Sequence, residues 1–325
     1  MQLIVILLAT VSILTFLSGA IVFFGSTKGD RVRSAWFFLA AIFATAWMAS
    51  ISIFLVAEPS MMGSIDWHVK WTFISAILID VSFLGYIAWR EKYGQAITTL
   101  FAVAGLIISL IILICPGSLY NEIILSRTGN SVIMNIGPVY FAYIGFFAAI
   151  VPAVVATLFK QYLKTRSERK KGGDLTIMIS FGLSSTITLI ANLVLPLFDN
   201  WSLIWLGPLA LSATIIAFYY TILRYRSLNL SSSWLKIFSY IVIIASLAIV
   251  YMIIFASIFA TLFRGSMPSS EVIILNFIMI LIFLLLMPAM NELNVFIRSL
   301  ISNQKPNHNK IKESHVSGSK TGKTA

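Results

Sequence analysis

The sequence predicts an all-α fold, a polytopic transmembrane bundle of about nine helices with its N-terminus outside and its C-terminus in the cytoplasm. Three observations support this: 59% of the 325 residues are hydrophobic, only 11% are charged, and the apolar residues gather in long windows. Soluble domains are about half apolar and about a quarter charged. A chain of this composition cannot hide its apolar surface in a water-soluble core, so the lipid bilayer is its expected solvent and partner.

Nine windows contain the roughly 20 apolar residues that a helix needs to cross a bilayer. Because no basic segment precedes the first window, we expect a permanent helix there and not a cleaved signal peptide. The windows lie at residues 3–25, 34–57, 71–89, 96–115, 139–162, 175–197, 205–223, 235–263 and 272–290.

Lys and Arg differ in number between the two sets of alternate connections. One set, together with the C-terminal tail, holds 20 of the 23 basic residues, and the other set holds only Lys70, Arg127 and Arg264. Because connections rich in Lys and Arg stay in the cytoplasm, this asymmetry predicts the orientation and explains the net charge of +11. The basic stretch KQYLKTRSERKKGGD (160–174) is expected to meet lipid head groups, and no nucleic-acid partner is expected.

Two connections on the predicted outer side are long enough to have structure of their own, residues 58–70 and residues 116–138. In the second, the apolar runs EIILS and SVIMN flank RTGN, in which Gly129 and Asn130 tolerate positive φ. This pattern predicts a β-hairpin that lies over the helix bundle. A plain plug and a lid that contacts a ligand are equal alternatives for the hairpin.

The sequence contains no motif typical of catalysis or cofactor binding. It has no Walker loop, dinucleotide fingerprint, HExxH, GxSxG or CxxC pattern, and its single cysteine, Cys115, cannot form a metal site alone. An intramembrane enzyme normally places several polar catalytic groups at similar depth in facing spans. We therefore predict a protein that is not an enzyme and that has no cofactor and no metal site.

One acid, Asp80, lies within the apolar stretch AILIDVSFLGY (76–86), at the midpoint of the third predicted span. A charge there costs at least a few kcal/mol, and Lys, Arg and His occur in the predicted spans only near their ends, where they do not offset that cost. We therefore expect a neutral carboxyl that faces the bundle interior and hydrogen-bonds to a Ser, Thr, Tyr or Asn of a neighbouring helix. Use of Asp80 by a transporter is the alternative.

Six other side chains in the spans are candidates for recognition or for packing. Asn192 is expected to hydrogen-bond between helices, and Tyr140 and Tyr143 to pack at the outer end of the fifth span. A ligand-binding role is the alternative for these three residues. Three aromatic residues are expected to anchor the third span at the two membrane interfaces: Trp71, Trp89 and Tyr86.

Four stretches occur in an order and spacing that are typical of one family. RSAWFFLAAIFATAWMAS (33–50) and IGPVYFAYIGFF (136–147) are similar to its second span and to the entry of its fifth. FGLSSTITLIANLVLP (181–196) and WLGPLALSATIIAFYYTILRYRSLNL (205–230) are similar to its sixth and seventh. Together they resemble the N-terminal seven-transmembrane sensor region of bacterial membrane histidine kinases, over roughly residues 1–230.

The resemblance extends into the segment that follows. Residues 231–301 are expected to form two further spans and a cytoplasmic linker helix, and residues 302–325 a disordered basic tail. LMPAMNELNVFIRSLI (286–301) resembles the exit from the last span in some of these kinases. The expected output-linker residues are Pro288, Glu292, Phe296, Ile297 and Arg298. Because the chain has no phospho-acceptor His box or ATP-binding Gly motif, kinase activity is not carried over.

The resemblance implies a sensory or receptor role in signal transduction at the bacterial cytoplasmic membrane. The chain would be the transmembrane input half of a sensor histidine kinase without its own catalytic domain, and a separate cytoplasmic kinase or response partner would bind the linker. A proton- or ion-coupled small-solute transporter and a non-catalytic membrane scaffold are the alternative functions. A homodimer is an open alternative for its assembly.

Overall fold

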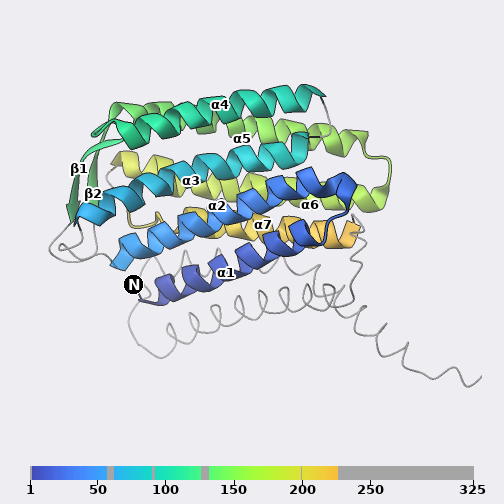
Figure 1. The fold of residues 1–325 in the computed structure, drawn as a ribbon, viewed down its shortest axis with the longest axis horizontal. Coiled ribbons are helices and arrows are strands. Elements are labelled where there is room, and N and C mark those ends of the chain that lie inside the picture. Colours follow the sequence, from blue (N-terminus) through green and yellow to red (C-terminus); the bar gives the residue numbers. More distant parts are fainter. Residues whose placement is uncertain (1, 57–61, 90–91, 126–131, 199, 226–325) are drawn as a thin grey trace, which may run out of the picture. The chain divides into compact units, whose positions relative to one another are not determined.

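A computed structural model describes residues 2–56, 62–89, 92–125, 132–198 and 200–225, all within one compact unit, Met1–Leu285. Long helices run back and forth along a common direction, and a β-hairpin lies at one end (Figure 1). The helices are α1 (Gln2–Phe24), α2 (Arg31–Val56), α3 (Met62–Ala88), α4 (Lys92–Ile114), α5 (Pro138–Lys164), α6 (Glu168–Leu189) and α7 (Leu206–Tyr225). A 3₁₀ turn, Lys28–Asp30, precedes α2.

The membrane-type helical bundle predicted from the apolar windows is confirmed. Within the described residues, six helices are long and apolar enough to cross a membrane, and α7 contributes a shorter apolar helix, Leu206–Ile222. The predicted windows at 235–263 and 272–290, the output linker and the tail lie outside the described residues.

The predicted hairpin is also confirmed. Strand β1 (Tyr120–Leu125) pairs antiparallel with β2 (Val132–Ile136), and Ile124 lies opposite Ile133. The expected turn at RTGN lies outside the described residues. The hairpin connects α4 to α5, so it lies at the end of the bundle where α2 ends and α3 begins (Figure 1). We call this the hairpin end and the opposite one the far end.

Three element boundaries differ from the prediction. α3 begins at Met62, so the part of the predicted outer loop that carries Asp66 and Lys70 is helical, and Asp80 lies about two thirds of the way along the helix. The predicted basic loop 160–174 is mostly helical as well, because α5 continues to Lys164 and α6 begins at Glu168. In both places the charged residues lower the average hydropathy without breaking the helix, since long charged side chains reach the interface from helix ends.

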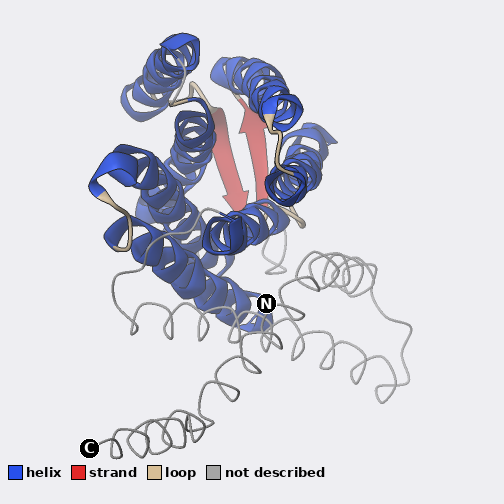
Figure 2. Cartoon of the chain, turned by 90° about the vertical axis from the view of Figure 1, so that its right-hand side faces the viewer, coloured by secondary structure: helices blue, strands red, loops and turns tan. Residues whose placement is uncertain are grey.

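The core of the described unit is built around α3. In its most apolar stretch 89% of the residues are buried, against 22% in α4. Packing against α2, α4 and α5 encloses α3, and the view along the bundle shows the helices side by side with the strands at the end away from the viewer (Figure 2). The outer face of α4 exposes large apolar side chains, which suits contact with lipid: Leu100, Leu106, Leu110 and Ile114.

Candidate functional site

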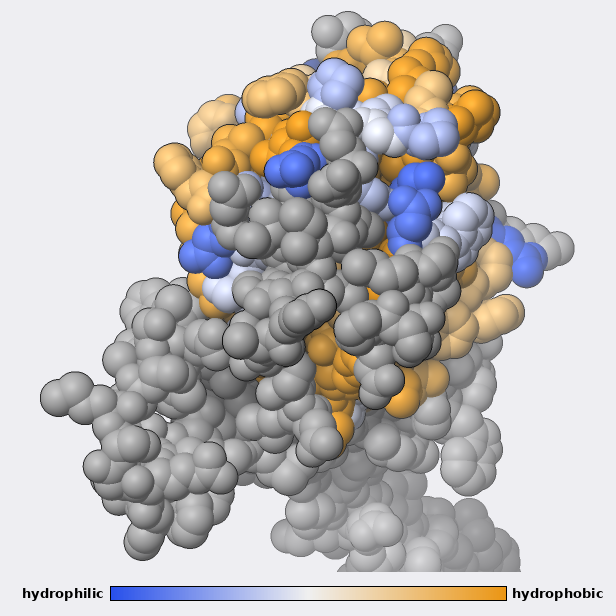
Figure 3. All heavy atoms as spheres, turned by 90° about the vertical axis from the view of Figure 1, so that its left-hand side faces the viewer, coloured by the Kyte–Doolittle hydropathy of each residue, from blue (hydrophilic) through white to orange (hydrophobic). Residues whose placement is uncertain are grey.

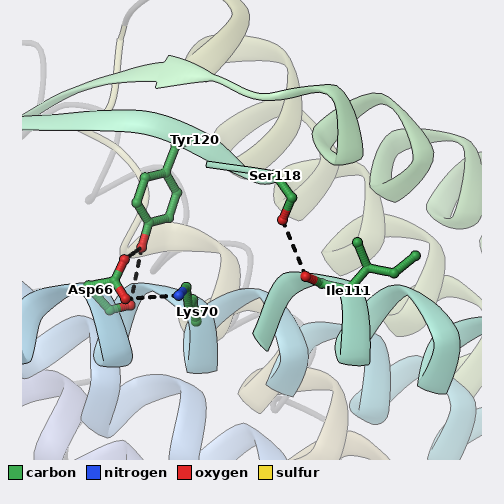
Figure 4. A network of polar contacts seen from close by, with 5 residues as sticks. All are labelled: Asp66, Lys70, Ile111, Ser118 and Tyr120. Atoms are coloured by element: carbon green, nitrogen blue, oxygen red, sulfur yellow. Dashed lines mark hydrogen bonds and ion pairs between the residues drawn. The ribbon is translucent and has the colours of Figure 1, made fainter. Parts of the chain in front are cut away.

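The hairpin is joined to α3 by a side-chain contact that spans the gap between β1 and the helix. The hydroxyl of Tyr120 donates to Asp66, both to Oδ1 at 2.5 Å and to the main-chain oxygen at 3.2 Å (Figure 4). Asp66 also forms an ion pair with Lys70, one turn further along α3, at 2.9 Å. Burial, and then the hydrogen bond to Asp66, raise the pKa of Tyr120 above its ordinary value, so the hydroxyl keeps its proton and stays a donor.

The base of the hairpin is joined to α5 and α4. The main-chain nitrogens of Gly137 and Val139 donate to the oxygens of Leu119 and Ser118, each at 2.8 Å. A Cβ atom at Gly137 would collide with the main chain of Ser118, so only glycine allows this close approach. The Ser118 hydroxyl donates to the Ile111 oxygen of α4 at 3.3 Å (Figure 4). A displacement of the hairpin therefore acts on three helices.

Hydrophilic side chains occur on the face of the molecule at the hairpin end, and hydrophobic ones lie around its margin (Figure 3). This distribution is expected where a bundle leaves the hydrocarbon core and meets water. The contacts between the hairpin and α3 thus lie at an end of the bundle that carries hydrophilic side chains.

Beneath the hairpin, two buried tyrosines of α5 pack against α3. The rings of Tyr140 and Tyr143 lie 6.0 and 5.0 Å from the ring of Phe73, measured between centroids. The Tyr140 hydroxyl donates to the main-chain oxygens of Asn192 and Leu193 at 3.1 and 3.2 Å. These predicted site residues therefore join α5 to α3 and to α6.

The end of α6 departs from α-helical geometry at the point that Tyr140 contacts. A π-helical turn, Ile190–Val194, is followed by a 3₁₀ turn, Leu195–Phe198, that contains Pro196. Proline has no N–H, so in a regular helix it would leave the oxygen of Asn192, four residues earlier, without its donor. Tyr140 supplies that donor. In the sequence, Pro196 four residues after Asn192 indicates that this main-chain oxygen needs another donor. It does not indicate that the donor is Tyr140, which lies 52 residues away.

Asn192 also joins α6 to the start of α7. Its Nδ2 atom donates to the Ile204 oxygen at 3.1 Å, and a Cβ atom at Gly207 would collide with its side-chain amide. The Thr188 hydroxyl donates to the Gly207 oxygen at 3.2 Å. The Oδ1 atom of Asn192 is buried and has no partner among the described residues. This geometry is consistent with the hydrogen bond between helices that the sequence predicts for Asn192.

Asp80 is buried in the centre of the bundle, with 2% of its surface exposed. Phe73 precedes it by seven residues and Phe83 follows it by three, so all three lie on one face of α3. The Phe83 ring contacts Phe181 of α6 and Phe218 of α7 at centroid distances of 5.6 and 5.1 Å. The interior location predicted for Asp80 is therefore observed. The predicted hydrogen bond is not seen at Oδ1, which has no partner in the described part of the chain.

The far end of α3 is held by side chains from two other helices. Arg33 of α2 donates through Nε to the Tyr86 oxygen at 2.9 Å, and Gln161 of α5 donates to the Ile87 oxygen at 2.6 Å. These bonds satisfy carbonyl oxygens of the last turn, which lack donors within the helix. Arg33 is buried, and its guanidinium lies 4.4 Å from the centroid of the Tyr86 ring.

The aromatic residues predicted to anchor α3 have different surroundings. Tyr86, in the last turn of α3, is buried under Arg33. Trp89 packs against Trp36 at a centroid distance of 6.1 Å. Trp71 lies nine residues after the first residue of α3 and packs against Trp67 at 5.6 Å. Sequence reasoning did not identify Arg33 and Gln161, because their partners are main-chain atoms of a distant helix.

These features define a class of protein: a multi-pass membrane bundle whose central helix is held at both ends by polar contacts and is joined to a hairpin at one of them. Over residues 6–231, more than two thirds of its length, the chain matches the family described as the N-terminal 7TM region of histidine kinase. The chain belongs to this family, as the resemblance over residues 1–230 predicted. The region is the non-catalytic sensor input of these kinases. No curated protein and no solved structure matches the chain significantly.

Proposed function

We propose that the chain is a receptor module that receives a signal at the hairpin end and transmits it through α3 to the far end. The observation that carries this proposal is the hydrogen bond from Tyr120 to Asp66. It joins the hairpin directly to the helix whose last turn is held by Arg33 and Gln161. A signal that displaces the hairpin thus acts on both ends of one buried helix.

The proposed orientation places the hairpin end outside the bacterial cytoplasmic membrane and the far end in the cytoplasm. The charge asymmetry of the sequence supports it, since 20 of the 23 basic residues fall in the connections of the far-end set and in the tail. In the described part, the basic residues Arg33, Lys164 and Lys171 lie near the far ends of their helices.

The proposed output is a movement at the far end that a cytoplasmic kinase or response partner reads at the linker around Pro288, Glu292, Phe296, Ile297 and Arg298. No catalytic step by the chain itself is required. A ligand shifts such a receptor only if it binds two arrangements of the bundle with unequal affinity. Couplings between such sites are typically about 1–3 kcal/mol.

Removing the Tyr120 hydroxyl tests the proposal. In the full chain in lipid nanodiscs, Tyr120→Phe should speed hydrogen exchange at the main-chain amides of residues 85–89, at the far end. The matched control is Ser202→Ala, which removes a hydroxyl that donates to Asn200 Oδ1 in the connection before α7. It should leave exchange at residues 85–89 unchanged. If Tyr120→Phe changes exchange only in the hairpin, α3 does not transmit and the proposal fails.

A further inference from the structure

We propose that the far end of α5 binds an anionic phospholipid of the cytoplasmic leaflet, and that the bound lipid stabilises the last turn of α3. The site, which we call the α5 collar, consists of Phe159, Lys160, Leu163, Lys164 and Arg166. The proposal rests on the proposed function for its orientation, because the far end must meet the cytoplasmic leaflet. It deepens that function by adding a lipid effector at the end where the output is read.

The α5 collar exposes apolar and basic side chains next to each other. Phe159 and Leu163 are 50% and 65% exposed. The three basic side chains of the collar are exposed as well. Residues four apart lie one above the other on a helix, so the two apolar residues form one stripe and Lys160 and Lys164 form the stripe beside it. A phospholipid has a matching arrangement, with acyl chains joined through glycerol to a charged phosphate.

The charge of the α5 collar favours an anion. The stretch 160–174 holds six basic and two acidic residues. One of these acids, Asp174 of α6, faces Thr165, whose hydroxyl donates to Oδ2 at 2.7 Å. Lys160 and Lys164 repel each other, because like charges four residues apart on a helix are destabilising. A phosphate between the two lysines offsets this repulsion, and basic residues at the cytoplasmic surface attract anionic lipids in the same way.

The position of the α5 collar favours a lipid over a soluble acidic partner. α5 is one of the helices that are long and apolar enough to cross a membrane, and the collar lies at its C-terminal end. At that end, exposed apolar side chains such as Phe159 and Leu163 suit the outer part of the acyl chains. Long basic side chains reach from there to the head groups. An occupant with both an apolar and an anionic part therefore fits the collar best.

Hydrogen bonds join the α5 collar to α3. Gln161 lies between the two lysines in sequence, and its Nε2 atom donates to the Ile87 oxygen of α3 at 2.6 Å. The main-chain nitrogen of Thr165 donates to the Gln161 oxygen at 3.0 Å, so the end of α5 keeps this turn in place. A lipid that holds Lys160 and Lys164 restrains the turn that carries Gln161, and with it the last turn of α3.

Photo-cross-linking of the full chain in lipid nanodiscs tests the site. Two probes with the same photoreactive acyl chain are compared, a phosphatidylglycerol and a phosphatidylcholine, and mass spectrometry locates the labelled residues. The wild type should be labelled within residues 159–166, preferentially by the phosphatidylglycerol probe. In Lys160→Gln with Lys164→Gln this preference should fall by about fivefold or more, because one cation near an anionic surface is worth about fivefold in affinity. The matched control, Lys160→Arg with Lys164→Arg, keeps both charges and should retain the preference.

Hydrogen exchange in the same nanodiscs tests the effect on α3. Exchange at the amides of residues 85–89 should be slower with phosphatidylglycerol present than in phosphatidylcholine alone. This difference should appear in the wild type and in the Arg control, and should be absent from the Gln variant. Equal labelling by the two probes would overturn the lipid and leave an acidic protein segment as the occupant of the collar. Labelling without a difference in exchange would overturn the effect on α3. The labelling does not depend on Tyr120, so it can fail while the Tyr120→Phe test succeeds, and the reverse.

Discussion

Tyr140 donates its hydroxyl to the main-chain oxygen of Asn192, at the position where Pro196 cannot supply a helical donor. One hydroxyl thus links α5 to the irregular end of α6. Tyr140→Phe should lower the free energy of unfolding by about 1 kcal/mol, the usual worth of such bonds between membrane helices. Denaturation in lipid nanodiscs measures it.

The control for this prediction is Pro196→Ala, which restores an N–H opposite the Asn192 oxygen. In that background Tyr140→Phe should cost less than in the wild type, because the oxygen has a second donor. An equal cost in both backgrounds would show that the missing proline N–H is not the reason for the contact.

The contact between Gly207 and Asn192 leaves no room for a side chain at position 207. Gly207→Ala should therefore destabilise the bundle by about 1–3 kcal/mol, as overpacking usually does. The cost should shrink when Asn192→Ala removes the obstructing amide. The matched control is Gly182→Ala on α6, where a Cβ atom meets nothing within 4 Å. That change should be neutral or stabilising by up to about 1 kcal/mol. A harmless Gly207→Ala would contradict the close approach.

A natural cysteine allows the orientation of the bundle in the membrane to be tested. Cys115 is its single cysteine, and it is exposed directly after α4 at the hairpin end. A membrane-impermeant maleimide should label it in intact cells. In the variant Cys115→Ala with Ser167→Cys, the thiol lies at the far end, between α5 and α6, and should react only after the membrane is permeabilised. The reverse pattern would place the hairpin in the cytoplasm.

Arg33 holds the last turn of α3 through both its Nε atom and its stacking on Tyr86. Arg33→Lys keeps the charge but loses the planar guanidinium, so it should destabilise the bundle by about 1–2 kcal/mol and speed exchange at the Tyr86 to Trp89 amides. Arg31→Lys is the control, because Arg31 is exposed and its guanidinium lies 5.8 Å from the Phe23 ring centroid. Its effect should stay below about 0.5 kcal/mol. Equal effects would show that the contacts of the Arg33 guanidinium with Tyr86 do not stabilise the end of α3.

The elements that depend on local pattern were predictable from the sequence. Apolar windows located the described helices, and two apolar runs around Gly129 and Asn130 located the hairpin. The start of α3 was placed too late, at residue 71, because Asp66, His68 and Lys70 lower the hydropathy of a segment that is nevertheless helical. Pro152 lies inside α5, and the helix continues through it. Neighbouring helices re-satisfy the main chain around a membrane proline.

The contacts that form the candidate site were not predictable, since each joins residues far apart in sequence. Tyr120 and Asp66 are 54 positions apart, and Arg33 and Tyr86 are 53. The composition of one segment does not identify the residue that it contacts in a distant segment. The burial of Asp80 followed from the cost of a charge in lipid, but its lack of a partner at Oδ1 depends on side-chain directions in several helices.

The enclosure of α3 limits the kinds of motion that it can transmit. Its 27 residues span about 40 Å, so it reaches from one membrane surface to the other as a single rod. A rod packed on every side cannot tilt or bend without opening the core around it, because close-packed interiors resist such gaps. It can still slide along its axis or rotate about it. Those two motions have different effects at the far end: sliding changes the height of the last turn of α3, and rotation changes which side chains it presents.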